Sequence, residues 1–233
     1  MPNHITNLVT FTGPEDVIAR LMTNAIVPRE DGKGERWTLG AFVPMPDSVK
    51  ATDRGISSSL NAGGDWTIMA RAQAMLSENK FNPHGCVMRH IPTYVRSWHQ
   101  LADWIDVNWP DAEKEARKAL LAAAETGYPG WYSWSNANWG TKWDAYQFKR
   151  VSSNCVRFQT AWAPPCPVFD AMAAQYPELT FTVESIDEGG GAYYGTYHGT
   201  GEMVEVEQTD ELYARVYGHE RPKYDDEPEG EVP

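Results

Sequence analysis

The sequence has few cysteines, no long apolar run and no basic N-terminal stretch. Its three cysteines, Cys86, Cys155 and Cys166, have no paired short spacing, which excludes a disulfide framework and fits a reducing compartment. Three scattered thiols also fall short of the four thiolates that hold an iron–sulfur cluster. No apolar run approaches the roughly 18 residues of a membrane span, and Met1–Thr10 lacks the pattern of a signal peptide. These absences predict a cytoplasmic protein.

Basic residues are also scarce, and the imbalance lies mostly at the C-terminal end. The formal net charge is −12; residues 202–233 carry eleven acidic and three basic residues, against twenty-one and seventeen in residues 1–201. This charge disfavours phosphate binding, which depends on Lys and Arg. Tyr224–Pro233 is predicted to be a disordered, solvated tail, because its Pro, Glu and Gly cannot repay the entropy of ordering. The alternative is an acidic arm that contacts a basic partner.

Strand and helix patterns alternate over the first half of the chain. His4–Phe11 is rich in Ile, Val, Thr and Phe and predicts a first strand. Pro14 suits the first position of a helix, whose apolar residues then recur at helical spacing. Trp37–Val43 predicts a second strand, which prolines end. Residues 52–127 predict a mainly helical insertion, and the 42% hydrophobic content is enough for a sizeable core.

The second half returns to the strand period. Val156 to Trp162 alternates, which places Val156, Phe158, Thr160 and Trp162 on one buried face. A helix that starts at Pro167 and a strand at Thr180–Ile186 follow, and Gly189–Gly191 turn the chain into a hairpin. The order predicts an α+β class with a ferredoxin-like split βαβ antiparallel sheet, a helical insertion and a C-terminal β-hairpin. We expect one domain over residues 1–201 and an acidic segment over 202–233.

Four of the ten tryptophans lie within residues 130–144. Tryptophan combines a large apolar face with one N–H donor, so such a density marks either a core or a binding surface. Trp139 and Trp143 are predicted to build the fold, with Gly140 in a tight turn. Trp131, Tyr132 and Trp134 come directly after a predicted loop and have small polar neighbours. Their side chains are therefore expected to be exposed and could stack on bases, sugars or a partner protein. The predicted binding residues are Trp131, Tyr132, Trp134, Asn136, Lys142 and Asp144.

Other groups of reactive side chains favour structural roles. His84, Cys86 and His90 have metal-ligating chemistry but no second pair to complete a zinc site. Asp187 and Glu188, before the three glycines, are more typical of a solvated bend than of an acid–base pair. The glycines lack the lysine and the context of a phosphate loop. The sequence therefore predicts no catalytic residue, no metal ligand and no cofactor.

Several motifs resemble a known family. PNHITN at Pro2–Asn7, NWGTKWDAY at Asn138–Tyr146 and FQTAWAPP at Phe158–Pro165, with YPEL at Tyr176–Leu179, are similar to the YubB family of plasmid and phage accessory proteins. The resemblance spans residues 2–201, and WGTKWD is its most specific element. It implies a ferredoxin-like domain and a mobile-element origin. It implies no catalytic residues, because the function of that family is unknown.

Three functions from different classes stay open. The first is a phage- or plasmid-encoded, non-enzymatic accessory protein that engages a protein of its bacterial host, for example as an inhibitor of a defence or nucleic-acid-handling protein. The second is a single-stranded nucleic-acid-binding module, which Lys142, Lys149, Arg150 and Arg157 near the tryptophans would serve. The third is a small-molecule enzyme that uses Asp144, Asp187, Glu188 or His198. The sequence favours the first, without fixing the oligomeric state.

Overall fold

The computed structural model describes residues 3–52 and 130–222 and, between them, residues 94–97, 99–100, 103–104, 107, 118, 121–122 and 124–128. The chain divides into two compact units. We call residues 1–43 with 140–233 the sheet unit, and residues 44–139 the insertion unit. Among the described residues, no helix is both long and apolar enough to cross a membrane.

The sheet unit contains a six-stranded sheet in which every neighbouring pair is antiparallel. The strand order is β4-β5-β1-β6-β7-β8, so β1 and β6 lie in the middle while β4 and β8 form the edges. The strands are β1 (His4–Thr12), β4 (Tyr146–Ser152), β5 (Cys155–Ala161), β6 (Thr180–Asp187), β7 (Ala192–His198) and β8 (Thr200–Val206).

The connections confirm the predicted ferredoxin-like fold. Helix α1 (Glu15–Ala25) follows β1, and α7 (Cys166–Gln175) joins β5 to β6. Each helix therefore leads from one strand to a parallel strand two places away, with an antiparallel strand between them, which is the split βαβ arrangement. The predicted hairpin is also present as β6 and β7, and β8 extends it.

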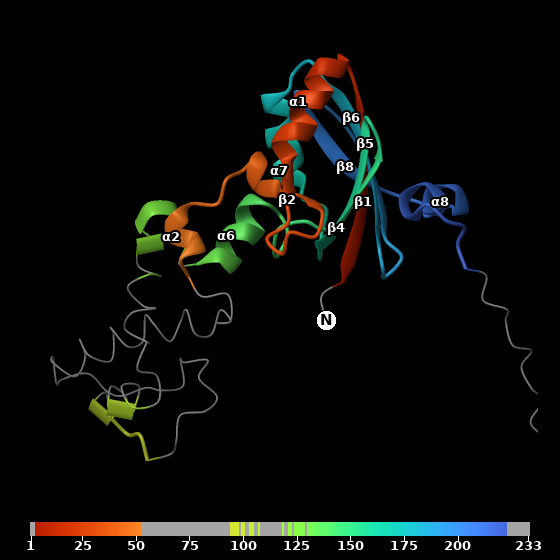
Figure 1. Ribbon diagram of the computed structural model, residues 1–233. Coiled ribbons are helices and arrows are strands. Elements are labelled where there is room, and N and C mark those ends of the chain that lie inside the picture. Colours follow the sequence, from red (N-terminus) through yellow and green to blue (C-terminus); the bar gives the residue numbers. More distant parts are fainter. Residues whose placement is uncertain are drawn as a thin grey trace, which may run out of the picture. The chain divides into compact units, whose positions relative to one another are not determined.

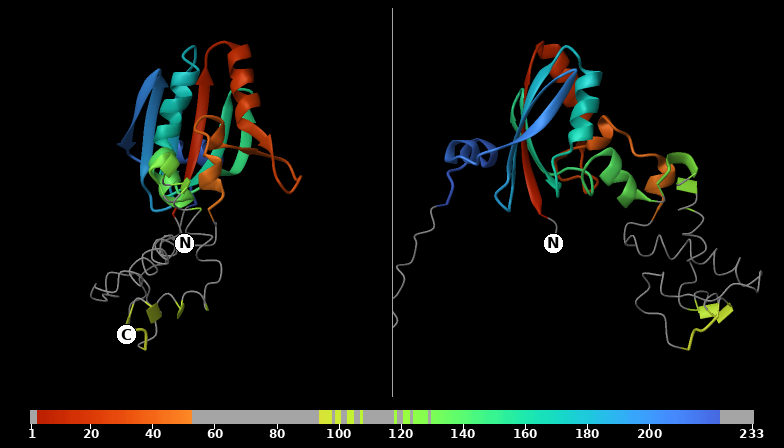
Figure 2. Two further views of the ribbon diagram at one scale, coloured as in Figure 1. Left: turned by 90° about the vertical axis from the view of Figure 1, so that its left-hand side faces the viewer. Right: turned by 180° about the vertical axis from the view of Figure 1, so that it is seen from behind.

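Helices lie on both faces of the sheet (Figures 1 and 2): α1 and α7 cover one, and α8 (Asp210–Tyr217) packs on the other. The first face holds the main core. Its side chains come from alternate strand positions and from the buried sides of the two helices, since strands alternate faces at every residue while helices repeat about every 3.6. Phe181 stacks on Tyr197 with 5.0 Å between ring centroids, and Phe169 of α7 packs against both.

The predicted strand at Trp37–Val43 is wrong. Strand β3 (Glu35–Trp37) ends at Trp37, pairs only with β2 (Ile26–Pro28), and gives way to the 3-10 turn Leu39–Ala41. Trp37 is nevertheless core: its ring lies parallel to that of Phe158 at 5.6 Å. The strand that completes the split βαβ unit is β4, in which the alternation of apolar and polar residues stops after Lys149 and the rest of the strand is exposed.

The folded chain continues past Gly201, where the sequence predicted the end of the domain. Strand β8 crosses that point and α8 follows. Leu212 and Val216 of α8 are buried against Leu8 and Ile186 of the sheet. The Thr209 hydroxyl accepts a hydrogen bond from the Leu212 N–H and caps the helix, so the acidic segment begins with folded structure.

Trp162 was predicted to point inward with Phe158, and this is also wrong. Strand β5 ends at Ala161, and Trp162 has φ 78° and a 42% exposed side chain. The left-handed backbone turns the chain away from the strand direction, so the alternation of faces stops one residue early.

The insertion unit is described in part, with α2 (Asp47–Lys50) and α6 (Trp131–Asn138) as its named helices. Most of the predicted helical segment 52–127 lies outside the described residues. So do His84, Cys86, His90 and the predicted tail Tyr224–Pro233.

Candidate functional site

Side chains from three distant parts of the chain meet at one end of the sheet. This end is where β1 and β4 begin and β5 finishes. The side chains are joined by ring contacts and hydrogen bonds, and we call them the aromatic cluster: His4, Lys142, Trp143, Tyr146 and Trp162.

Lys142 contacts two indole rings. Its Nζ atom is 4.7 Å from the ring centroid of Trp143 and 4.9 Å from that of Trp162. Both distances are within the range of a cation–π interaction, in which the ammonium is attracted to the negative face of the ring. The lysine therefore fixes the two tryptophans relative to each other and brings a positive charge among them.

Trp162 is held in a strained conformation. Its φ of 78° lies in the left-handed region, which costs a residue with a Cβ about 1–2 kcal/mol. The backbone N–H of Trp162 donates a hydrogen bond of 2.9 Å to the Asn3 carbonyl, which anchors the residue to the start of β1. Most strained residues persist because their surroundings force them, and they cluster at functional sites.

His4 and Tyr146 form the inner half of the cluster. The Tyr146 hydroxyl is 2.6 Å from Nδ1 of His4 and donates a hydrogen bond of 3.1 Å to the Thr160 carbonyl. Burial raises the pKa of Tyr146 to about 12, and the nearby negative charge of Glu188 adds to this. Tyr146 is therefore a neutral hydrogen-bonding group at neutral pH.

The loop that carries Lys142 and Trp143 is tied to the end of β5. Thr141 is fully buried, and its hydroxyl donates to the Ala161 carbonyl at 2.8 Å and accepts from the Ala161 N–H at 3.0 Å. Gly140 has φ 75°, and a Cβ there would lie 2.9 Å from Cδ of Pro167. The predicted tight turn at Gly140 is therefore present.

Asp144 has a structural role. One carboxylate oxygen accepts from Nη1 of Arg36 at 2.6 Å and from the Thr38 hydroxyl at 2.8 Å. The other accepts from the backbone N–H groups of Leu39 and Ala145 at 2.7 and 2.9 Å. These contacts tie the loop before β4 to the turn that replaces the predicted strand. Asp144 therefore organises the fold beside the aromatic cluster.

The other four predicted binding residues lie on α6 of the insertion unit. Trp134 is only 5% exposed and packs edge-on against Trp139, so the expectation of an exposed side chain is wrong for Trp134. Trp131 and Tyr132 are half-buried and contact each other edge-on at 5.9 Å. The Asn136 side chain donates to the Tyr132 carbonyl one turn earlier. A binding role for Trp131, Tyr132 and Asn136 stays a prediction.

The structure thus divides the predicted site. Lys142 and Asp144 belong to the sheet unit and the four others to the insertion unit. The sequence prediction missed His4, Tyr146 and Trp162. A signal was present, since all three lie in the motifs PNHITN, NWGTKWDAY and FQTAWAPP, which the fold brings together.

The candidate acid–base residues Asp187 and His198 form contacts outside the aromatic cluster. The Asp187 carboxylate accepts from the Gly191 N–H, and the backbones of the two residues also pair, which is the predicted bend. His198 contacts the Thr180 hydroxyl at 3.3 Å at the far end of the β6–β7 hairpin. Within the described part of the chain, no group of three or more His, Cys, Asp and Glu is placed to hold a metal ion.

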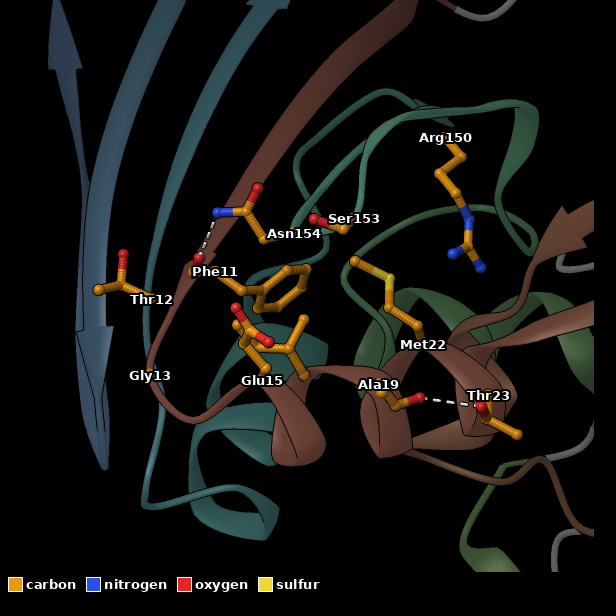
Figure 3. A pocket seen from close by; sticks show the side chains of 11 residues that line it. Phe11, Thr12, Gly13, Glu15, Ala19, Met22, Thr23, Arg150, Ser153 and Asn154 are labelled. Carbon is orange, nitrogen blue, oxygen red and sulfur yellow. Dashed lines mark hydrogen bonds between the residues drawn. The ribbon is translucent and has the colours of Figure 1, made fainter.

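An open groove of about 700 Å³ lies between α1 and the β4–β5 turn (Figure 3). Asn154 forms one wall, where its side-chain amide donates to the Phe11 carbonyl at 2.9 Å. Glu15 and Arg150 are its charged lining residues, and Met22 is among the apolar ones. The groove includes none of the aromatic cluster and none of the four candidate acid–base residues.

Residues 138–223 match the family model described as "Ferredoxin-like domain in Api92-like protein". The matched range runs from the loop of the aromatic cluster through α8. A crystal structure of the protein api92 from Yersinia pseudotuberculosis is also similar over 90% of this chain and 99% of that chain, at 12% identity and a TM-score of 0.41. No curated protein sequence matches the chain. The family match supports the ferredoxin-like resemblance but carries the Api92-like name instead of YubB.

Proposed function

We propose that this chain is a non-enzymatic binding protein and that the aromatic cluster is the surface with which it engages a partner protein. The observation that carries the proposal is Trp162, which is 42% exposed and held in a left-handed conformation. An exposed indole on a strained backbone costs free energy and adds little to the core. Exposed, rigid tryptophans are typical of the few residues that dominate the free energy of protein–protein binding.

The neighbours of Trp162 support the same function. Lys142 contacts the ring at 4.9 Å and also contacts the ring of Trp143 at 4.7 Å. A surface that is fixed before binding loses less conformational entropy when a partner arrives. The cluster also joins apolar rings to a positive charge, so it suits a partner surface that combines apolar and acidic side chains.

The finer form of the proposal concerns origin and target. We infer a phage- or plasmid-encoded accessory protein whose partner is a protein of the bacterial host, and inhibition of a defence or nucleic-acid-handling protein is its most specific version. The inferred origin and the inferred host partner rest on the YubB resemblance of the motifs and on the acidic charge of the chain.

The nucleic-acid alternative has less support. Ferredoxin-like modules that bind single strands stack bases on aromatic side chains of the sheet. On the α8 side, the residues of the paired strands β1 and β5 are Thr6 and Leu8 of β1 and Arg157 and Gln159 of β5, none of which is Phe, Tyr or Trp. The Arg157 side chain donates to the Arg215 carbonyl of α8, which covers part of this face.

The test is affinity capture from a bacterial lysate with quantitative mass spectrometry. It compares the intact chain with Trp162→Ala and with Tyr94→Ala, a control aromatic that is 62% exposed in the insertion unit. We expect the intact chain and the control to recover the same stoichiometric protein, and Trp162→Ala to recover about tenfold less or lower still. Circular dichroism checks that all three chains are folded.

Either of two results would overturn the proposal. One is that the intact chain recovers no protein in stoichiometric amount. The other is that folded Trp162→Ala recovers as much partner as the intact chain does. A chain that ends at Gly201 is unsuitable for this comparison, because it lacks most of β8 and all of α8.

A further inference from the structure

Strand β8 forms the edge of the sheet opposite β4, and no described strand pairs with its outer side. The Asp187 N–H donates to the Gly191 carbonyl, so odd-numbered residues of β7 turn their hydrogen-bonding groups to β6 and even-numbered ones turn them to their even-numbered partners on β8. The hydrogen-bonding groups of Gly201 therefore point outward. Alternate residues of a strand point these groups to the same side, which places those of Met203 and Glu205 outward as well. An edge of this kind is a template for another strand.

The side chains around this edge are acidic. Glu202, Glu205 and Glu207 are exposed. From Thr200 to Arg221 the chain has six acidic residues and two arginines. Arg215 already binds Glu184 through Nη2 at 2.7 Å, and Arg221 lies 3.8 Å from Asp210. The negative charge of β8 therefore has little compensation from nearby basic residues.

An apolar strip runs beside the acidic residues. Val204 is 49% exposed and Tyr194, its cross-strand partner on β7, is 38% exposed. Cross-strand neighbours on one face stabilise a sheet through contact of their side chains. An incoming strand would find Val204 and Glu202 on one face of the sheet and the carboxylate of Glu205 on the other.

We propose that β8 is a docking edge for an extended protein segment in which lysine or arginine alternates with apolar residues. The segment adds a seventh strand to the sheet through backbone hydrogen bonds; its basic side chains lie on the face of Glu205 and pair with that carboxylate, while its apolar side chains lie on the face of Val204. A second copy of this chain fits poorly, because it would bring two acidic edges together. This inference goes beyond the proposed function, since it uses no residue of the aromatic cluster.

The test measures the binding of a fluorescently labelled octapeptide of alternating lysine and valine by anisotropy at low salt. We expect Glu202→Lys with Glu205→Lys to weaken binding about tenfold, since the charge pair at Glu205 is lost and both new lysines repel the basic peptide. Met203→Pro should abolish binding while the fold is kept, because proline is tolerated on an edge strand where the N–H faces solvent. Hydrogen exchange should slow at the β8 amides when peptide is added.

Three controls separate the contributions. Glu30→Lys with Glu35→Lys makes the same change of net charge on exposed residues at the β2–β3 hairpin, and it should leave the affinity close to that of the intact chain. Trp162→Ala should leave it unchanged, so the two proposals fail separately. A peptide with glutamate in place of lysine should not bind.

The proposal is overturned if no peptide binding is seen, or if the two charge-reversed chains lose affinity equally. It is also overturned if a peptide with an N-methyl group on every residue binds as well as the unmodified one, because such a peptide has no backbone N–H to donate to a strand edge. A dimer of the intact chain in sedimentation that Met203→Pro abolishes would overturn it too, since the edge would then belong to a second copy.

Discussion

At the scale of single residues, the aromatic cluster depends on two conformations that a sequence pattern does not reveal. Trp162 leaves the strand direction through its positive φ, and Lys142 contacts two rings from different segments. Asp144 satisfies both carboxylate oxygens with neighbours more than 100 positions away as well as with Ala145. The same short motif therefore contains one residue that builds the fold and one that belongs to the candidate surface.

The strain at Trp162 can be measured by substitution. Alanine keeps the Cβ that disfavours the left-handed region, whereas glycine removes it. We expect Trp162→Gly to be more stable than Trp162→Ala by about 1 kcal/mol in urea unfolding. Val151 is an exposed strand residue without positive φ, so there the alanine variant should be more stable than the glycine variant. If alanine and glycine ranked the same way at Trp162 and Val151, strain at Trp162 would be contradicted.

Asp144 should matter for stability. Its removal leaves the Leu39 N–H and the Arg36 guanidinium without their acceptor in a half-buried setting. We expect Asp144→Ala to lower the free energy of unfolding by about 3 kcal/mol. The control Asp47→Ala removes a side chain that is 97% exposed and forms a surface ion pair with Lys50, so it should change this free energy by about 0.5 kcal/mol or less. Equal effects would contradict the structural role.

Tyr146 should affect the stability at alkaline pH. Its pKa is about 12 in the folded chain against 10.0 for an ordinary tyrosine, so the folded state holds the proton more tightly than the unfolded state. The stabilisation is therefore complete below pH 10 and is lost as the pH rises towards 12. We expect Tyr146→Phe to make the loss of stability shallower in this range and to remove one late-titrating group from the ultraviolet titration of the tyrosines. Unchanged curves would contradict the assignment.

At the scale of elements, burial decided what could be predicted. The predictions for β1, α1, β5, α7, β6 and β7 follow apolar periodicity and are confirmed in type. Strand β4 was missed because its alternation covers only Tyr146–Lys149, which is short for a strand signal, and its remaining residues are exposed. At Trp37–Val43 the apolar residues imitate a strand, but the Asp144 carboxylate binds the Leu39 N–H and a turn forms instead.

Helix α8 carried a readable signal that its charge obscured. Thr209 is an N-cap, acidic residues occupy the first turn, and Gly218 ends the helix with φ 78°. The apolar residues Leu212 and Val216 are one turn apart. The high acidity of the whole C-terminal segment masks this pattern in the sequence.

Removal of α8 should expose the second face of the sheet. A chain that ends at Glu207 leaves Leu8 and Ile186 without their helix partners, so we expect a loss of several kcal/mol of stability and increased binding of a hydrophobic dye. A chain that ends at Pro222 keeps α8 and serves as the control. Thermal unfolding compares the two, and similar melting temperatures would contradict a structural role of α8.

At the scale of the whole molecule, the chain interrupts one compact unit with another. Residues 44–139 lie between α1 and β4, in the connection where a ferredoxin-like fold needs only a short link. The sequence predicted an insertion there, although the observed unit starts earlier and ends later than residues 52–127.

This division predicts that the sheet unit folds by itself. We expect this of a chain in which a flexible Gly/Ser linker replaces residues 44–139. It should unfold cooperatively and keep the circular dichroism of an α+β protein, because the buried residues on both faces of the sheet belong to the sheet unit. The control is the same linked chain with Phe181→Ala, which should lose several kcal/mol of stability. Non-cooperative unfolding of the linked chain would contradict independent folding.

The sequence by itself determined the fold class and the buried elements, because burial imposes a period of two on strands and about 3.6 on helices. It also contained the motifs of the aromatic cluster. Only the tertiary structure decided that His4, Tyr146 and Trp162 meet, that Trp134 is buried, and that β8 is an edge. Those features depend on contacts between segments up to about 160 residues apart, and local periodicity carries no information on such contacts.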